Sequence, residues 1–259
     1  MSNIKIRFLG TCAADYSPRL ADECRDRYDL DARRSSAALI NGRYLIDCGE
    51  HILDEFRISG EDMAAVTDLF VTHLHADHYN PEHIKIIASK KKEPLRVWVR
   101  ENAVLPDIPN THIMRMKDLE TYKIDEYTSV TGLEANHDQR TSPQHLLFEC
   151  GGKKLFYGLD GGWLLNGTYN YLKRAALDML VLDCTVGDYV GDFRMGEHNS
   201  IPMIRLMLAS FKTFKITKDD TLVYLSHVAP SLHKPHKETA EALIKENMHL
   251  AYDGLTVEI

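Results

Sequence analysis

Apolar and polar residues alternate in several short stretches of the chain, a pattern typical of strands with one buried face. Near the start, Ile4, Ile6 and Phe8 are separated by two basic residues. Asn41-Gly42 joins two such stretches, and this dipeptide favours a tight hairpin turn. Further strands are expected over residues 36–40, 43–46, 68–71, 95–99, 146–150, 154–158, 179–183 and 221–225, with antiparallel pairing across 118–150.

Other segments show the three- and four-residue spacing of an amphipathic helix, for example Ile84, Ile87 and Ala88. Helices are expected over residues 50–57, 81–92, 169–176, 200–210 and 235–248, and a long polar surface loop over 13–34. Hairpins give way to strand–helix alternation twice along the chain. This order fits two sheets packed face to face with helices outside, as one α/β (α+β) domain over residues 1–259.

Composition narrows the class of protein. The chain has 259 residues, 44% apolar and 27% charged, as is ordinary for a globular protein. Its 31 basic and 38 acidic residues give a net charge of −7, which disfavours extended nucleic acid as a partner. We expect no leader peptide, and no apolar run approaches the ~20 residues of a membrane span. The 5 cysteines form no CxxC pair, so we expect reduced thiols and a cytoplasmic protein.

The most informative stretch follows the apolar run 69–71 and contains His73, His75, Asp77 and His78. His73 and His75 are two residues apart and therefore lie on the same side of an extended segment. Asp77 and His78 come after the chain has turned, so they can face a second point nearby. Imidazole and carboxylate are good ligands for zinc, manganese or iron. The spacing predicts ligands for two adjacent metal ions.

Three later residues also follow strand-like runs: His137, Asp160 and His227. Each alone has an ordinary explanation, as a loop residue, a turn residue and a strand-end residue. Together with the cluster at 73–78, they predict one site, because loops that leave the same edge of a sandwich can meet. Asp47 also ends a strand-like run. It either holds an adjacent loop or caps the helix expected over residues 50–57.

The pattern His73-x-His75-x-Asp77-His78, followed by His137, Asp160 and His227, resembles the metallo-β-lactamase superfamily over essentially the whole chain. The resemblance implies a four-layer αββα sandwich with a dinuclear site at one edge. It implies His73, His75 and His137 on one metal, Asp77, His78 and His227 on the other, and Asp160 as the bridge. Asp47 matches the superfamily's strand-end aspartate, which orients the histidine loop. Asp77 is assigned a catalytic role as well as a ligand role.

A narrower resemblance rests on His198, which precedes a predicted helix between Asp160 and His227. A histidine in this place is similar to that of PhnP-type phosphodiesterases, and implies that His198 contacts the phosphoryl group or donates a proton to the leaving group. The other interpretation is a helix cap. His233 is a second candidate for substrate contact, and Arg33-Arg34 a third. PhnP-type enzymes also carry a structural zinc, which is not expected here.

In PhnP-type enzymes, the structural zinc is held by several N-terminal cysteines and by a histidine just after the last catalytic histidine. This chain offers only Cys12 and Cys24 in the N-terminal loop, and Pro230 where the histidine is expected.

The resemblance implies a hydrolase that cleaves a small, cyclic or nucleotide-like phosphodiester with a hydroxide shared by two divalent ions, Zn²⁺ or Mn²⁺. Homo-oligomerisation is left open. Three alternatives remain: a tRNA 3′-processing endonuclease, a thioester hydrolase of glyoxalase II type, and a non-catalytic sandwich that binds a ligand. The tRNA enzymes carry a basic arm that this acidic chain lacks, and glyoxalase II carries a C-terminal helical domain for which no room follows His227.

Overall fold

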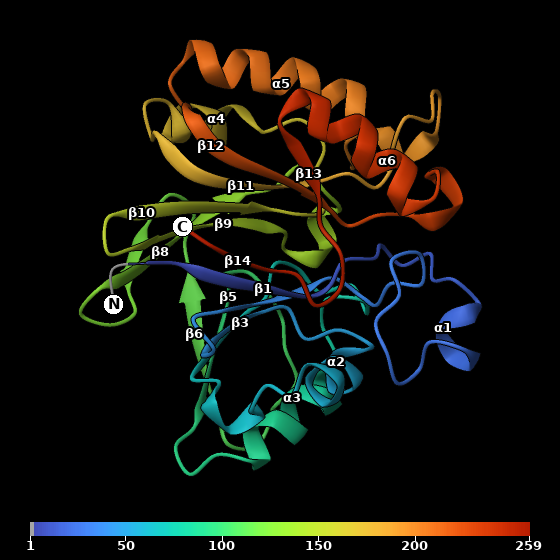
Figure 1. Ribbon diagram of the computed structural model, residues 1–259. Coiled ribbons are helices and arrows are strands. Elements are labelled where there is room, and N and C mark those ends of the chain that lie inside the picture. Colours follow the sequence, from blue (N-terminus) through green and yellow to red (C-terminus); the bar gives the residue numbers. More distant parts are fainter. Residues whose placement is uncertain (1–2) are drawn as a thin grey trace.

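Two seven-stranded sheets pack face to face in the computed structural model, which describes residues 3–259 (Figure 1). The spatial order is β14-β1-β2-β3-β4-β5-β6 in the first sheet and β13-β12-β11-β10-β9-β8-β7 in the second. The first sheet is antiparallel from β14 to β3 and parallel from β3 to β6. The second is antiparallel from β7 to β10 and parallel from β10 to β13. Each sheet therefore consists of an antiparallel half and a parallel half.

The first sheet consists of β1 (Lys5–Gly10), β2 (Ala37–Ile40), β3 (Tyr44–Ile46), β4 (Asp68–Phe70), β5 (Leu95–Arg100), β6 (Thr111–Met116) and β14 (Thr256–Glu258). The second consists of β7 (Thr121–Lys123), β8 (Thr128–Glu134), β9 (Gln144–Cys150), β10 (Lys153–Gly158), β11 (Leu177–Asp183), β12 (Thr217–Ser226) and β13 (Met248–Leu250).

Helices cover the outer face of each sheet (Figure 1). On the first sheet they are α2 (Ile52–Ser59) and α3 (Pro81–Ser89), and on the second α4 (Asn166–Leu172), α5 (Ile201–Thr213) and α6 (His236–Leu243). The short α1 (Arg19–Asp22) lies in the 13–34 loop, and single 3₁₀ turns are η1 (Met63–Ala65), η2 (Gln139–Thr141), η3 (Phe193–Gly196), η4 (Pro230–Leu232) and η5 (Ile244–Glu246). The four layers confirm the predicted αββα sandwich.

The strand pattern explains the layering. In β11 all seven residues are buried, with Met179 and Val181 facing the first sheet and Leu180 and Leu182 facing the helices. A strand covered on both faces reads as a continuous apolar run, whereas β1 alternates. Between the sheets, the ring of Phe70 packs edge-on against Phe148 with 5.1 Å between centroids.

Helix ends follow their sequence signals. Asn80 accepts hydrogen bonds from the first turn of α3, and Ser200 accepts one from Met203 in the first turn of α5. Pro81 and Pro202 occupy first-turn positions, where the missing N–H is not needed. The side chain of His198 therefore lies outside α5, since Ser200 supplies the cap.

Three strands were not predicted, and all of them lie at sheet edges: β6, β13 and β14. The helix expected over 235–248 is also too long, because α6 ends at Leu243 and a left-handed residue, Asn247 (φ 57°), turns the chain into β13. β13 and β14 have only three residues each, and in β6 only Met116 is fully buried, so the apolar alternation of these strands is weak. Within residues 3–259, no helix is long and apolar enough to cross a membrane.

Candidate metal centre

The candidate ligands gather at one edge of the sandwich because each follows a strand. The loop 73–78 leaves β4, and the residues after β8, β10 and β12 are His137, Asp160 and His227. Asp160, His227 and also Asp47 have left-handed backbone conformations, with φ of 48°, 58° and 64°. Such conformations are uncommon outside glycine and turn the chain sharply as it leaves the strand. The three turned residues all contact one side chain, that of His78.

Three imidazoles form the first group of candidate ligands. Nδ1 of His75 lies 2.9 Å from Nε2 of His73 and 3.1 Å from Nε2 of His137. Burial lowers the pKa of His73 and of His137, so both rings stay neutral at pH 7 and keep a lone pair. Nitrogen atoms that face one another at this distance need a proton or a cation between them. Three imidazole nitrogens fit a divalent ion such as zinc.

A second group surrounds His78. Its Nε2 lies 2.7 Å from Oδ2 of Asp160, 3.2 Å from Oδ2 of Asp77 and 3.2 Å from Nε2 of His227. Burial opposes a positive charge on His78, but the carboxylates of Asp160 and Asp77 outweigh it and raise its pKa well above the ordinary value. Two imidazoles and two carboxylates thus lie close together, and a nearby positive charge would stabilise all four. A divalent ion satisfies this donor set.

Asp160 lies between the two groups. Its Oδ2 contacts the Nε2 atoms of His78 and His227, at 2.7 and 3.0 Å, and its Oδ1 is 3.9 Å from Nε2 of His137. The groups are also adjacent through His73, whose donor atom is within 4.8 Å of both His75 and His78. The arrangement fits two neighbouring ions with Asp160 as a shared ligand, the role that the resemblance implied.

Asp47 holds the histidine loop and does not cap a helix. Its carboxylate accepts hydrogen bonds from the backbone N–H of Thr72 (2.7 Å) and lies 2.7 Å from Nδ1 of His78. The helix nearby, α2, has His51 at its N-cap position. Since Nδ1 of His78 is engaged by Asp47, Nε2 faces the metal group.

A glycine permits this close packing. A Cβ atom at Gly49 would lie 1.8 Å from the backbone oxygen of Asp77. Any side chain at position 49 would therefore displace the loop that carries the ligands. The sequence does not reveal this role of Gly49, because the neighbour it contacts, Asp77, is distant in the chain.

Asp183, at the end of β11, is a site residue that the sequence analysis missed. Its Oδ2 is 2.9 Å from Nδ1 of His198 and 3.3 Å from Nδ1 of His227, and it also accepts a hydrogen bond from Thr185. Burial disfavours its charge, but His198 and His227 outweigh burial and lower the pKa of Asp183. Asp47 was considered as a site residue because it ends a strand. Asp183 ends a strand in the same way.

Asp183 is better described as an orienting group than as a ligand. Its donor atom is within 4.8 Å of those of Asp160, His198 and His227, so a third compact group exists. However, Asp183 lies on the Nδ1 side of His227, whereas Nε2 of that ring faces Asp160. The opposite nitrogens of one imidazole point in opposite directions, which places Asp183 behind the ligand.

His198 stands beside the candidate ligands. Its ring is stacked on that of His227, with 5.6 Å between centroids and 11° between planes. Burial opposes protonation, but Asp183 outweighs it and raises the pKa of His198. With Nδ1 bound to Asp183, the other nitrogen, Nε2, is available to a substrate. The structure thus brings His198 to the wall of the cavity that His75, Asp160 and His227 also line.

A cavity of about 550 Å³ opens over these residues. The 13–34 loop contributes Asp15 to its wall, and the loop after β11 contributes Arg194 and Glu197. Asp15 accepts a 3.2 Å hydrogen bond from the backbone of Ser231, which ties the N-terminal loop to η4. The 13–34 loop therefore shapes the cavity.

His233 is not brought to this cavity. Its Nε2 donates to the carbonyl oxygen of Cys184 at 2.6 Å, and it lines a separate cavity with Arg33 and His236. The expected substrate contact of His233 is therefore not supported, because the ring nitrogen that would make it holds the backbone.

The expectation for Arg33-Arg34 also needs correction. Both side chains are buried. Arg33 donates to the carbonyl oxygens of Leu30 and Ala251, and Arg34 to that of Cys24. Arg33 thus fastens the 13–34 loop to the body of the protein through Ala251, and Arg34 holds parts of the loop to one another.

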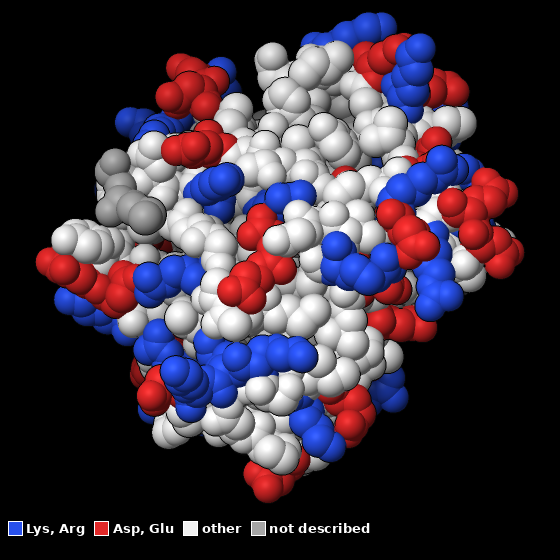
Figure 2. Space-filling model, turned by 60° about the horizontal axis from the view of Figure 1, so that its bottom comes forward, with Lys and Arg blue, Asp and Glu red and all other residues white. Residues whose placement is uncertain are grey.

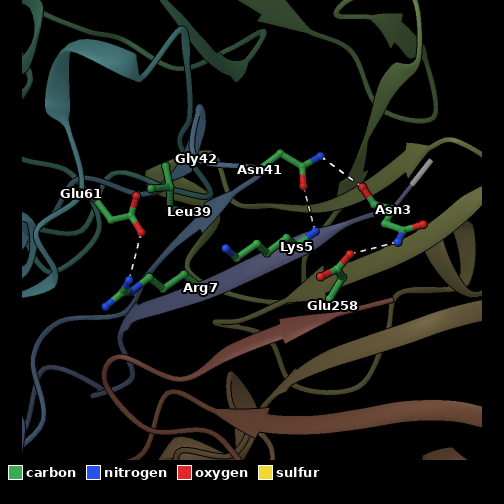
Figure 3. Close-up of a pocket in the computed structure, with 8 residues that line it drawn as sticks. All are labelled: Asn3, Lys5, Arg7, Leu39, Asn41, Gly42, Glu61 and Glu258. Atoms are coloured by element: carbon green, nitrogen blue, oxygen red, sulfur yellow. Dashed lines mark hydrogen bonds and ion pairs between the residues drawn. The ribbon is translucent and has the colours of Figure 1, made fainter. Parts of the chain in front are cut away.

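Another cavity, of about 440 Å³, lies over β1 and the β2–β3 turn (Figure 3). Arg7 pairs with Glu61 at 3.0 Å, and Glu258 accepts a hydrogen bond from Asn3 at 3.0 Å. The cavity contains no histidine and lies on the outer face of the first sheet.

Comparison with solved structures identifies the fold. A diphosphatase of the PhnP family superposes with a TM-score of 0.73 at 16% identity, covering 99% of this chain and 97% of that one. The metallo-β-lactamase fold protein YhfI from Bacillus subtilis gives 0.70 at 12% identity, covering 100% of both chains. The short form of human tRNase Z gives 0.68 at 20% identity, covering 98% of both. No protein-family model and no curated sequence matches the chain.

The chain therefore has the metallo-β-lactamase fold. At its strand-end edge, the described chain carries three overlapping groups of histidine and aspartate side chains that could hold metal ions.

Proposed function

We propose that this protein is a dinuclear metal-dependent hydrolase that cleaves a small phosphodiester. The observation that carries the proposal is the carboxylate of Asp160, which stands between two groups of histidine and aspartate donors. His73, His75 and His137 would hold one ion, and Asp77, His78 and His227 the other. The diphosphatase among the similar structures supports a phosphate ester as the substrate class.

When bound, two divalent ions would lower the pKa of a water molecule between them and neutralise charge on the phosphoryl oxygens. Asp77 combines two tasks in this proposal, because it is a ligand that also lines the cavity. Its free oxygen would accept a hydrogen bond from the attacking water and fix its direction. The ring positions of His78 and His227 are set from behind by Asp47 and Asp183.

In this proposal, His198 assists the departure of the leaving group. As the water oxygen forms its bond to phosphorus, the bond from phosphorus to the leaving oxygen breaks. Nε2–H of His198 would donate its proton to that oxygen, and solvent would later return one. Asp183, 2.9 Å from Nδ1, stabilises the ring in the orientation that presents Nε2. General-acid help of this kind is worth about 10²–10⁴-fold in rate.

Two enzymatic alternatives use the same ligands. A tRNA 3′-processing nuclease must contact many phosphates, and tRNase Z is among the similar structures. The net charge of −7 disfavours this alternative, and the face shown in Figure 2 carries acidic and basic side chains interspersed. A thioester hydrolase does not require a donor such as His198 with its carboxylate partner. A non-catalytic ligand-binding sandwich would not need both groups of donors.

The proposal is tested with one metal-loaded preparation and a panel of substrates: bis(p-nitrophenyl) phosphate, cyclic nucleotides, precursor tRNA and S-lactoylglutathione. We expect diester hydrolysis to exceed thioester hydrolysis, little tRNA cleavage, and loss of activity with a chelator. Preference for the thioester, or efficient tRNA 3′-end cleavage, would overturn the assignment. Absence of turnover on the whole panel by protein that holds two ions would favour the ligand-binding alternative.

A further inference from the structure

The loop between β11 and α5 exposes large apolar side chains beside the candidate metal centre. Tyr189, Val190 and Phe193 are 55%, 83% and 88% exposed. Four and five residues after Phe193, the same loop enters the cavity wall with Glu197 and His198. Exposed apolar side chains that gather beside a cavity are typical of binding sites.

The loop is fixed at both ends. At its base, the backbone of Val186 bonds that of Asn199 (3.1 Å), and Ile201 bonds Gly187 (2.8 Å). Within it, Asp192 caps η3 by accepting from the backbone N–H of Arg194 (2.9 Å). These hydrogen bonds fix the backbone around Phe193 in a conformation that exposes its side chain.

Arg194 connects the exposed ring to the metal centre. Its guanidinium carbon lies 5.5 Å from the centroid of the Phe193 ring, and the side chain lines the cavity. Among residues 3–259, it is the one arginine or lysine that does so. Two hydrogen bonds to Asp192, of 2.8 and 3.0 Å, orient the guanidinium through Nε and Nη2. Within the described chain, Nη1 has no protein partner.

We propose that Phe193 and Arg194 form a subsite for an aromatic leaving group, so that the substrate is an aryl or nucleoside ester of phosphate. The inference rests on the proposed function, since it names the substrate class of that site. Phe193 stacks against the aromatic ring of the substrate, and Nη1 of Arg194 donates to a phosphoryl oxygen. An aromatic side chain paired with a guanidinium suits a flat ring attached to an anion.

A second copy of this chain is the other candidate for covering Phe193. The substrate is favoured because the exposed ring lies beside Arg194, the cation in a cavity wall that also carries Asp15 and Glu197. A contact between copies would not require Arg194 to be held by Asp192 with one nitrogen left free. Self-association is accordingly an outcome that the experiment must distinguish.

The test measures binding of phenyl phosphate and methyl phosphate to the full-length, metal-loaded protein by calorimetry. Phe193→Ala should weaken phenyl phosphate by about threefold to tenfold, as expected for one aromatic pair, and leave methyl phosphate unchanged. Arg194→Gln should weaken both ligands. Val190→Ala is the matched control from the same exposed loop and should change neither.

Equal effects of Phe193→Ala on the two ligands, or no effect on either, would overturn the subsite. Sedimentation of the same proteins shows whether Phe193→Ala instead disrupts a dimer, which would also overturn it. Because binding is measured without turnover, the subsite is judged separately from the proposed function. A Phe193-dependent preference for phenyl phosphate in a protein that hydrolyses no diester would support the subsite and contradict the function.

Discussion

Oδ2 of Asp183 lies 2.9 Å from Nδ1 of His198, so a fully buried carboxylate stands directly behind the candidate proton donor. The same oxygen is 3.3 Å from Nδ1 of the candidate ligand His227. One residue thus orients two rings with different tasks. This relationship makes Asp183 the best place to separate orientation from coordination.

Replacing Asp183 with asparagine should lower kcat by about 10–100-fold, the usual effect of losing a carboxylate behind a ligand or acid. The amide keeps the size of the side chain but has one acceptor oxygen, whereas Asp183 uses Oδ2 for His198 and Oδ1 for the backbone N–H groups of Thr185 and Asn199. Activity is measured at saturating metal, with metal content determined in parallel. Asp178→Asn is the matched control, because it lies at the other end of β11 and pairs with Lys153 and Lys218. Equal losses in both variants would assign the effect to the strand.

Metal content should separate ligands from the proton donor. The wild type should bind about two divalent ions per chain, because Asp160 contacts His78 and His227 through Oδ2 and faces His137 through Oδ1. Asp160→Ala should lower both metal content and turnover, since it removes the shared ligand. His198→Ala should keep both ions and lose rate. Elemental analysis after gentle purification measures this, and loss of metal from His198→Ala would contradict its assignment as an acid.

Asp47→Ala should destabilise the metal-free protein by about 2–4 kcal/mol, because the N–H of Thr72 and Nδ1 of His78 lose their buried acceptor. Asp47→Asn should lose less. Asparagine retains an oxygen for Thr72 and tolerates the left-handed conformation at this position. Urea denaturation in the presence of a chelator compares the two free energies of unfolding. Equal destabilisation by both would show that the hydrogen bonds contribute little.

The free energy of unfolding should depend on pH through the ionisation of Asp253. Burial raises the pKa of this carboxyl to about 6 from an ordinary value of 3.8. The native state therefore holds the proton more tightly than the unfolded state. Its stabilising effect is complete below pH 4 and is lost as the pH rises through 6. Between these two pH ranges, the contribution of Asp253 to the free energy of unfolding changes by roughly 3 kcal/mol.

Asp253→Asn should not show this loss, because the amide does not ionise. Unfolding of wild type and variant is compared at pH 4, 5, 6 and 7, and the difference between them should grow in favour of the variant. A difference that stays constant across the series would contradict a raised pKa at Asp253.

The strongest sequence signals were those in which chemistry and strand pattern coincide. The 73–78 cluster, Asp160 and His227 all follow apolar runs, and the structure places them together. The edge strand β6 escaped notice because only Met116 of its six residues is fully buried. Arg33 looked like a surface residue because its charge is visible in the sequence, whereas the carbonyl groups that satisfy it are not.

Asp183 was missed for a different reason. Its strand is apolar throughout, and the carboxylate that ends it resembles an ordinary strand terminus until His198 and His227 are placed beside it. Partners 15 and 44 residues away along the chain cannot be read from spacing (198 − 183 and 227 − 183). Such pairings are decided by the order of strands in the sheet.

The left-handed backbone at Asp47, Asp160 and His227 constrains how this centre can drift during evolution. Asparagine, aspartate, histidine and glycine tolerate that conformation, whereas β-branched residues do not. A descendant that abandons metal chemistry should therefore carry asparagine or glycine at these positions long before valine or isoleucine. The geometry of the strand ends would then outlast the activity, leaving an inactive relative recognisable from its backbone.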